Sequence, residues 1–188
     1  MRVILGILLA VAACGQAAFA QTDAAGLEPA WNIAVIVEQI GKDTARLLPV
    51  LDTVNAADWV SRGASDTYLA QLQSSKDQAR AIAAEAQALS RNPEKLSAGL
   101  QLFFRFEGLE SMLNSIEDAA RRYQNAQVAQ TLASTFAESG ANRERFRSYI
   151  VNLAAEREHQ FEVMDQEAQR CRGILMTPPP KAKPVKKK

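Results

Sequence analysis

Apolar residues recur in alternating steps of four and three along most of the chain. In the first such segment, about Leu27–Val54, the line runs through Ile33, Val37, Ile40, Thr44, Leu47, Leu51 and Val54. This spacing places one apolar stripe along an α-helix and is typical of left-handed helix packing. Pro49 is expected to kink this helix or end it early, because proline cannot donate an interior helical hydrogen bond.

Three further long segments and one short segment carry the same repeat. Gly63 separates the first two segments, Ser65 or Asp66 can cap the second helix, and Asn92 and Pro93 are expected to open the third. The short segment is about Ala126–Glu138, and the last long helix is expected over about Asn142–Arg172 with Gly173 as its C-cap. The stripes of the three long segments are Tyr68, Leu72, Ser75, Ala79, Ile82, Ala86 and Leu89; Leu102, Phe106, Leu109, Leu113, Ile116, Ala120 and Tyr123; and Phe146, Ile150, Ala154, Arg157, Phe161, Met164, Ala168 and Cys171.

These patterns predict an all-α fold, an up-and-down antiparallel helical bundle of four long helices plus a short extra helix. Alternation of the kind seen in β-strands is absent from the sequence. We expect the apolar stripes to form one core within a single chain. The same heptad line could equally serve oligomerisation.

The N-terminal residues resemble a secretory signal. Residues 1–20 have a basic start at Arg2, a short apolar run and the small-x-small sequence Ala18-Phe19-Ala20, which favours cleavage before Gln21 and a periplasmic or secreted protein. A lipobox-like sequence ending at Cys14 is the alternative, and it would give an anchored lipoprotein. We therefore expect a helical bundle domain over residues 21–176 and a disordered Pro/Lys-rich tail over residues 177–188.

Charge separates the body of the chain from its tail. The formal net charge is +1, but residues 21–176 contain 16 basic and 21 acidic side chains, and five lysines lie in the tail. An acidic body is not typical of a nucleic-acid-binding protein. The tail sequence "PPPKAKPVKKK" is expected to be extended and solvated. The alternative is that it makes weak contact with an anionic envelope surface.

Metal, cofactor and catalytic motifs are missing from the sequence. His159 is the one histidine, and its helical position opposite the stripe predicts exposure, which leaves no histidine-based metal site. Cys171 falls on the stripe and is expected to be buried and inert, with intermolecular disulfide pairing as the alternative. Nucleotide-binding, haem-attachment and nucleophile-elbow motifs are absent, so we expect neither a cofactor nor an enzyme.

Two groups of residues are candidates for a functional site. Arg157 falls on the last stripe, and we expect it to be at least half buried and paired with Glu110. With Thr44 and Ser75, these residues could form a polar layer that fixes the helix register or, alternatively, an internal site for an anion or small ligand.

The second group lies in "LQLFFRF", the densest apolar stretch of the mature chain. Leu100 and Phe103 point away from the third stripe and Phe104 points further round. One interpretation covers this face with the short helix and the loop around Trp59. In the other, Phe103 or Phe104 is exposed as an anchor for a partner, and Arg105 lies at the rim. The favoured function is an exported interaction or scaffold module, whose partner would be another envelope or secreted protein.

The first testable prediction concerns processing. We expect N-terminal sequencing of the exported protein to read Gln21 as the first residue, because Ala18-Phe19-Ala20 follows the apolar run at the usual distance. A mature chain that starts at a lipid-modified Cys14 would contradict this prediction and would identify an anchored protein.

Overall fold

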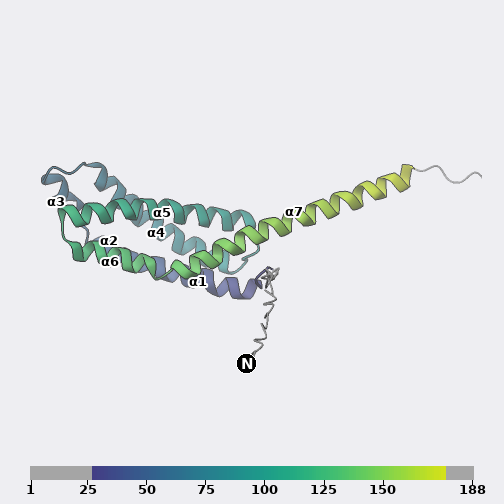
Figure 1. Cartoon of the computed structure of the whole chain (residues 1–188), viewed down its shortest axis with the longest axis horizontal. Coiled ribbons are helices and arrows are strands. Elements are labelled where there is room, and N and C mark those ends of the chain that lie inside the picture. The colour runs from purple at the N-terminus through teal and green to yellow at the C-terminus, as the bar shows by residue number, and fades with distance from the viewer. Residues whose placement is uncertain (1–26, 177–188) are drawn as a thin grey trace, which may run out of the picture.

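The computed structural model describes residues 27–176, and within them the protein is an all-α helical bundle, as the sequence predicts (Figure 1). The predicted signal segment 1–20 and tail 177–188 lie outside the described residues. Among the described helices, none combines the length and apolar character needed to span a bilayer. The helices are α1 (Ala30–Ala45), α2 (Leu47–Asp52), α3 (Ala56–Ser61), α4 (Thr67–Ser90), α5 (Leu96–Tyr123), α6 (Ala126–Ala137) and α7 (Gly140–Met176).

The bundle has four rows of helices, and the last row is shared by two helices. The chain runs out along α1 and α2, back along α4 and out again along α5 (Figure 1). Both α6 and the first part of α7 then pack against α1 and α5. The 12 residues of α6 and the fourteen residues from Gly140 to Leu153 together match the 28-residue α5 in length.

This arrangement corrects the predicted place of the short helix. The sequence allowed α6 to cover Leu100 and Phe103 as a second layer. Instead α6 occupies half of the fourth row, and α7 lies beside Phe103 through Phe146 and Arg147.

The core combines the predicted stripes of the first three rows with buried residues of α3, α6 and the first part of α7. The α1 stripe is buried throughout, and so are Ile82 and Ala86 on α4 and Leu109 and Ile116 on α5. Burial of such a stripe provides most of the stability of an amphipathic helix. The apolar periodicity therefore identified the inward face of these rows.

Pro49 divides the first row as expected. It lacks the N–H that would bond to the carbonyl of Ala45, and its ring would crowd that carbonyl in a regular helix. The break falls at Arg46, between the end of α1 at Ala45 and the start of α2 at Leu47.

The predicted start of the third row is wrong by one turn. Asn92 and Pro93 do not open α5. They form a tight turn in which the Lys95 N–H donates to the Asn92 carbonyl at 3.2 Å, and α5 begins at Leu96. Proline at the second position of a turn is favourable because its φ angle already suits the turn.

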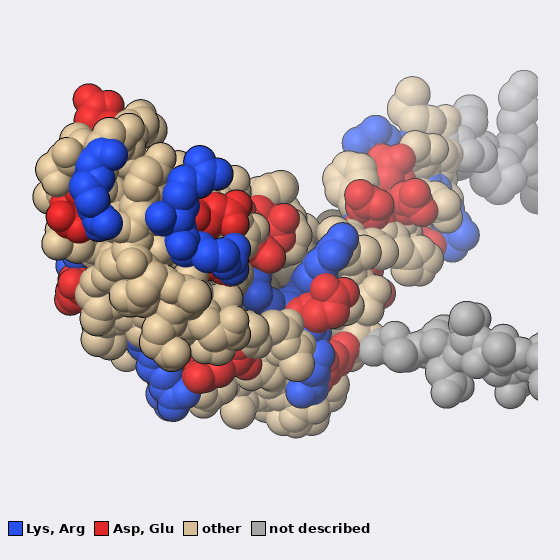
Figure 2. Space-filling view, turned by 60° about the vertical axis from the view of Figure 1, so that its left-hand side comes forward, with Lys and Arg blue, Asp and Glu red and all other residues tan. Residues whose placement is uncertain are grey.

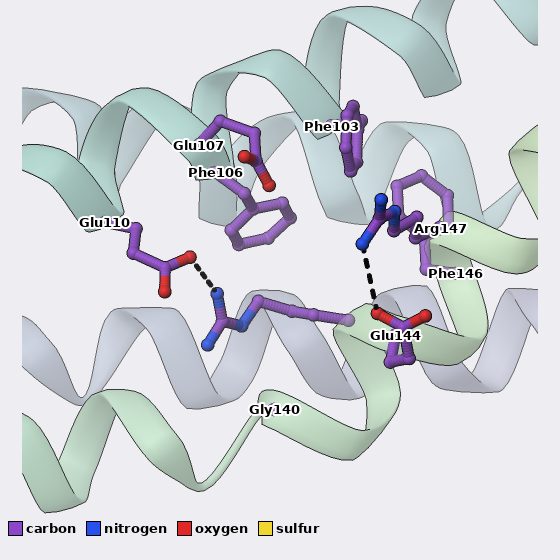
Figure 3. A pocket seen from close by; sticks show the side chains of 9 residues that line it. Phe103, Phe106, Glu107, Glu110, Gly140, Glu144, Phe146 and Arg147 are labelled. Atoms are coloured by element: carbon purple, nitrogen blue, oxygen red, sulfur yellow. Dashed lines mark hydrogen bonds and ion pairs between the residues drawn. The ribbon is translucent and has the colours of Figure 1, made fainter.

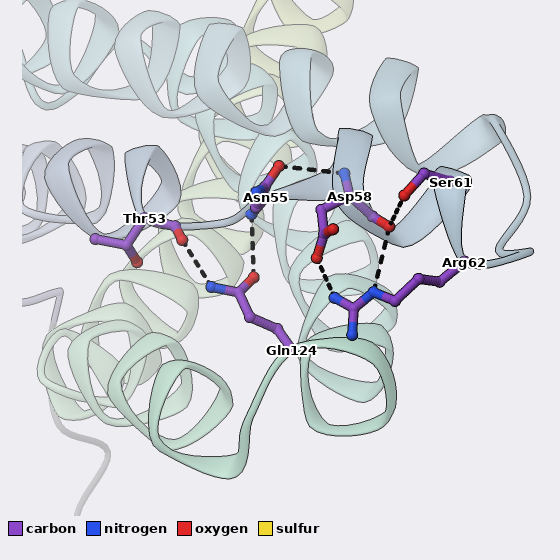
Figure 4. Close-up of polar contacts among 6 residues, drawn as sticks. All are labelled: Thr53, Asn55, Asp58, Ser61, Arg62 and Gln124. Atoms are coloured by element: carbon purple, nitrogen blue, oxygen red, sulfur yellow. Dashed lines mark hydrogen bonds and ion pairs between the residues drawn. The ribbon is translucent and has the colours of Figure 1, made fainter.

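At the far end of the bundle one glutamine side chain joins two connections (Figure 4). The Gln124 Nε2 donates to the Thr53 carbonyl at 2.9 Å, and its Oε1 accepts from the Asn55 N–H at 3.0 Å. Asn55 in turn caps α3 by accepting from the Asp58 N–H at 3.2 Å. The segment around Trp59, expected as a loop, is thus a short capped helix with a fully buried indole.

The last helix continues far beyond the bundle. Leu153 is its last buried residue, and every residue from Arg157 to Met176 is exposed. We call residues 157–176 the arm; it projects as a single helix (Figure 1). The expectation that this part of the last stripe is core is therefore wrong, because α6 fills half of the fourth row and displaces α7 along it. Gly173, expected as a C-cap, lies inside α7.

Helices α1 and α4 approach closely at Gly41. A Cβ atom on Gly41 would lie 2.9 Å from the Ala86 Cβ and 3.3 Å from the Ala83 carbonyl oxygen, both on α4. Exposed Gly108 on α5 has open space where its Cβ would lie. The same glycine-to-alanine substitution can therefore be compared at a crowded position, Gly41, and at an open one, Gly108.

We expect Gly41→Ala to lower the free energy of unfolding by about 1–2 kcal/mol, because overpacking outweighs the gain in helix propensity. Gly108→Ala, the control, is expected to raise it by about 0.5–1 kcal/mol. Urea denaturation followed by circular dichroism measures both. Equal stabilisation by the two substitutions would contradict the close approach at Gly41.

Candidate functional site

The predicted internal polar layer does not form as one group. Thr44 and Ser75 are buried, as expected for stripe positions. Each hydroxyl, however, donates to a carbonyl of its own helix: Thr44 to Ile40 at 2.8 Å and Ser75 to Gln71 at 2.9 Å. These local bonds satisfy the two hydroxyls without a bound ligand.

The prediction for Arg157 is wrong. Its side chain is exposed, and its Nη1 donates to Gln160 one turn further along the arm at 2.9 Å. Arg157 lies where α7 leaves the bundle. Burial raises the pKa of the nearby Tyr149 phenol, the Glu94 carboxylate raises it further, and the Arg157 guanidinium partly offsets both effects.

Arg143 takes the place that the sequence assigned to Arg157. Its Nη1 donates to the Glu110 carboxylate at 3.1 Å, and its guanidinium lies 3.9 Å from the centre of the Phe136 ring. The Arg143 side chain is 19% exposed and that of Glu110 44% exposed. Arg143 precedes Arg157 by two heptads. It therefore lies on the same face of the helix, but within the bundle.

A hollow of about 230 Å³ surrounds this ion pair, between α5 and the start of α7 (Figure 3). Phe103 and Phe106 form its apolar wall, and Glu107 and Arg147 lie at its edge. Arg147 pairs with Glu144 at 3.7 Å on its own helix. The hollow is smaller than most small-molecule sites, and its cations already have carboxylate partners. This geometry favours a structural ion pair over a site for a free anion.

The three candidate residues for a partner patch have different surroundings. Arg105 bonds to Glu85 at 2.8 Å and to Gln78 at 3.1 Å, so it joins α5 to α4. Phe103 is half-buried against the core, and its ring meets Phe104 edge-on at 5.6 Å. Phe104 is 65% exposed. The patch is thus reduced to one open aromatic ring.

A larger apolar surface lies on the arm, where the heptad pattern predicts core residues as far as Cys171. Phe161 is 72% exposed, Met164 69% and Leu175 84%. Phe161 and Met164 belong to the predicted stripe and Leu175 follows four residues after its last member, Cys171, but the periodicity did not show that the bundle has no partner for them. Acidic and basic side chains are interspersed over the body and arm (Figure 2), so the arm offers its apolar stripe within a mixed-charge surface.

The arm also carries the two residues considered for metal or thiol chemistry. His159 is exposed, as predicted, whereas Cys171 is exposed and not buried. Within residues 27–176 no three side chains of the types histidine, cysteine, aspartate and glutamate converge on one point.

The contrast between the two arginines can be tested. We expect Arg143→Met to lower the free energy of unfolding by about 1–2 kcal/mol, because it removes a half-buried ion pair and the contact with Phe136. Arg157→Met, the matched control on the same helix face, is expected to change it by less than about 0.5 kcal/mol. Chemical denaturation of both variants measures the difference, and the reverse order would contradict the assignment of Glu110 to Arg143.

No protein-family model, curated protein or solved structure matches the chain.

Proposed function

We propose that this protein is an exported, non-catalytic interaction or scaffold module. The bundle is the folded base, and the arm is the element that binds another protein. The observation that carries this proposal is the exposed apolar stripe of the arm, including Phe161, Met164 and Leu175. Export is supported by the apolar run and Ala18-Phe19-Ala20 at the N-terminus. The partner is accordingly another envelope or secreted protein, or a second copy of this chain.

The energetics of an isolated helix support a binding role for the arm. Its twenty residues extend for about 30 Å and are all exposed, although Phe161 and Glu162 still line a surface hollow together with Leu96 at the start of α5. A helix of this length is only marginally stable in water unless an amphipathic face is buried. A partner that covers the stripe stabilises the helix and removes the apolar side chains from water at once.

An internal ligand site, the alternative from the sequence, has less support. Arg157 lies outside the bundle, and Thr44 and Ser75 bond to their own helices. Arg143, the cation that pairs with Glu110, already has a carboxylate and an aromatic ring as partners. We therefore propose the arm, and not the bundle interior, as the functional site.

The test compares two surfaces on the same chain. Native mass spectrometry of material gently extracted from the native compartment is expected to show wild-type protein in an assembly. The double variant Phe161→Gln/Met164→Gln is expected to lose that assembly, because two exposed apolar anchors of the arm become polar. Phe104→Gln, the control on the bundle surface, is expected to keep it.

Two results would contradict the proposal. A wild-type protein that is monomeric in its native compartment would show that the arm has no protein partner. Loss of the assembly in Phe104→Gln but not in the arm variant would move the interaction surface to the start of α5.

A further inference from the structure

The exposed stripe of the arm has the spacing of a coiled-coil seam. In a heptad repeat, whose positions are lettered from "a" to "g", the residues at "a" and "d" form the seam. Phe161, Ala168 and Leu175 occupy "a" positions, and Met164 and Cys171 occupy "d" positions. All five are exposed. The opposite face carries His159 and Gln166, which suit contact with water. We refer to the five a and d residues as the arm seam.

We propose that the arm seam pairs with the arm seam of a second copy of this chain, in a parallel and in-register two-stranded coiled coil. This inference rests on the proposed function and names its partner. The heptad stripes of α1, α4 and α5 are already buried in the bundle. Among the described helices, the arm is therefore the one whose heptad stripe is exposed and available for pairing.

The start of the seam follows from the position of the bundle. Arg157, at the preceding "d" position, is charged. Burial raises the pKa of the Tyr149 phenol, and the Arg157 guanidinium lies close enough to the bundle to offset part of this rise. Phe161 is eight residues beyond the last buried residue, Leu153. The seam thus begins about one heptad beyond the core, with the two bundles at the amino ends of the paired arms.

Charges beside the seam favour the parallel orientation. In a parallel pair, a g residue faces the e residue five positions later in the other chain. Glu167 at g then faces Arg172 at e of the second copy, and symmetry makes this pair twice. Gln160 faces Asp165 without repulsion. Glu167 bonds to Arg170 on its own helix at 3.0 Å, whereas Arg172 makes no ion pair within residues 27–176.

Antiparallel registers are less favourable. The register that sets Phe161 against Cys171 of the other copy brings Asp165 beside Asp165, and Glu167 beside Glu167. A register shifted by one heptad pairs Asp165 with Arg172, but it places Phe161 opposite position 178, which is a proline. Only the parallel pairing combines a buried Phe161 with attractive flanking charges.

The short seam sets the expected strength of the dimer. Fifteen residues from Phe161 to Leu175 span about 22 Å. Two heptads bury less area than the roughly 1,200–2,000 Å² of a stable specific interface. We expect a dimer whose population depends on protein concentration, and which a bond between the two Cys171 side chains would hold together.

The first experiment measures the mass of the purified full chain by light scattering over a wide range of concentrations. Wild type is expected to pass from monomer to dimer, and Phe161→Gln/Met164→Gln is expected to remain monomeric throughout. Val163→Gln is the matched control, because Val163 is an exposed apolar residue on the arm but off the seam. The thermal unfolding of the bundle is expected to be the same in all three, since the arm is outside the core.

The second experiment tests orientation by charge reversal. Glu167→Arg and Arg172→Glu each replace two attractive pairs with two repulsive ones, so each is expected to weaken dimerisation roughly three- to tenfold. The double variant restores opposite charges in a parallel pair and is expected to return to within about twofold of wild type. In the shifted antiparallel register Glu167 faces Ile174, where its charge has no partner. If Glu167→Arg leaves dimerisation unchanged, the parallel assignment is overturned.

The third experiment uses Cys171 as a probe in a Cys14→Ser background, where it is the sole thiol. With oxidised glutathione, two Cys171 thiols form one disulfide, and their two protons and two electrons convert one oxidised glutathione to two reduced molecules. Wild-type and Val163→Gln arms are expected to give a covalent dimer, and the seam variant is expected to give little.

The outcomes separate this inference from the proposed function. A wild-type chain that stays monomeric at all concentrations and forms no covalent dimer would overturn self-pairing. If that monomer still binds a different protein through Phe161 and Met164, the interaction module remains correct. If the seam variant dimerises like wild type, the arm seam is not the interface.

Discussion

The bundle depends on the close contact between α1 and α4. Gly41 brings the α1 backbone against Ala83 and Ala86 of α4, and a single added methyl group would collide there. Small side chains at a helix contact allow long stretches of both helices to bury their stripes. The row formed by α1 is in turn a wall for α6 and for the start of α7. The fourth row has a close approach of its own at Gly99 of α5, where an added Cβ would collide with the Ile150 Cδ1 of α7.

The arm is a consequence of how the fourth row is filled. A single helix in that row would have matched α5 and ended with the bundle. Because α6 takes the far half, the 37-residue α7 starts midway along the row and continues past its end. The same heptad that buries Phe146 and Ile150 then continues into water as Phe161 and Met164. An apolar stripe of the kind that packs inside the bundle is therefore exposed to water on the arm.

Arg143 and Arg157 show how far periodicity can identify a site. Both lie on the inward face of the last helix, and a carboxylate partner at Glu110 was the correct choice for one of them. A repeat of seven residues cannot distinguish positions two heptads apart, because both have the same direction around the helix axis. Position along the axis decides which arginine meets Glu110. The same ambiguity made Cys171 look buried when it is exposed.

The sequence by itself determined the all-α class, the inward faces of the first three rows, the break at Pro49 and the exposure of His159. These features follow from local rules of spacing and backbone chemistry, which act over one or two helical turns. Only the tertiary structure decided that α6 shares the fourth row, that Arg143 pairs with Glu110 and that Phe161, Met164 and Cys171 face water. These features depend on where one helix stops against another, and a periodic pattern carries the direction of each side chain but not the axial position of its neighbour.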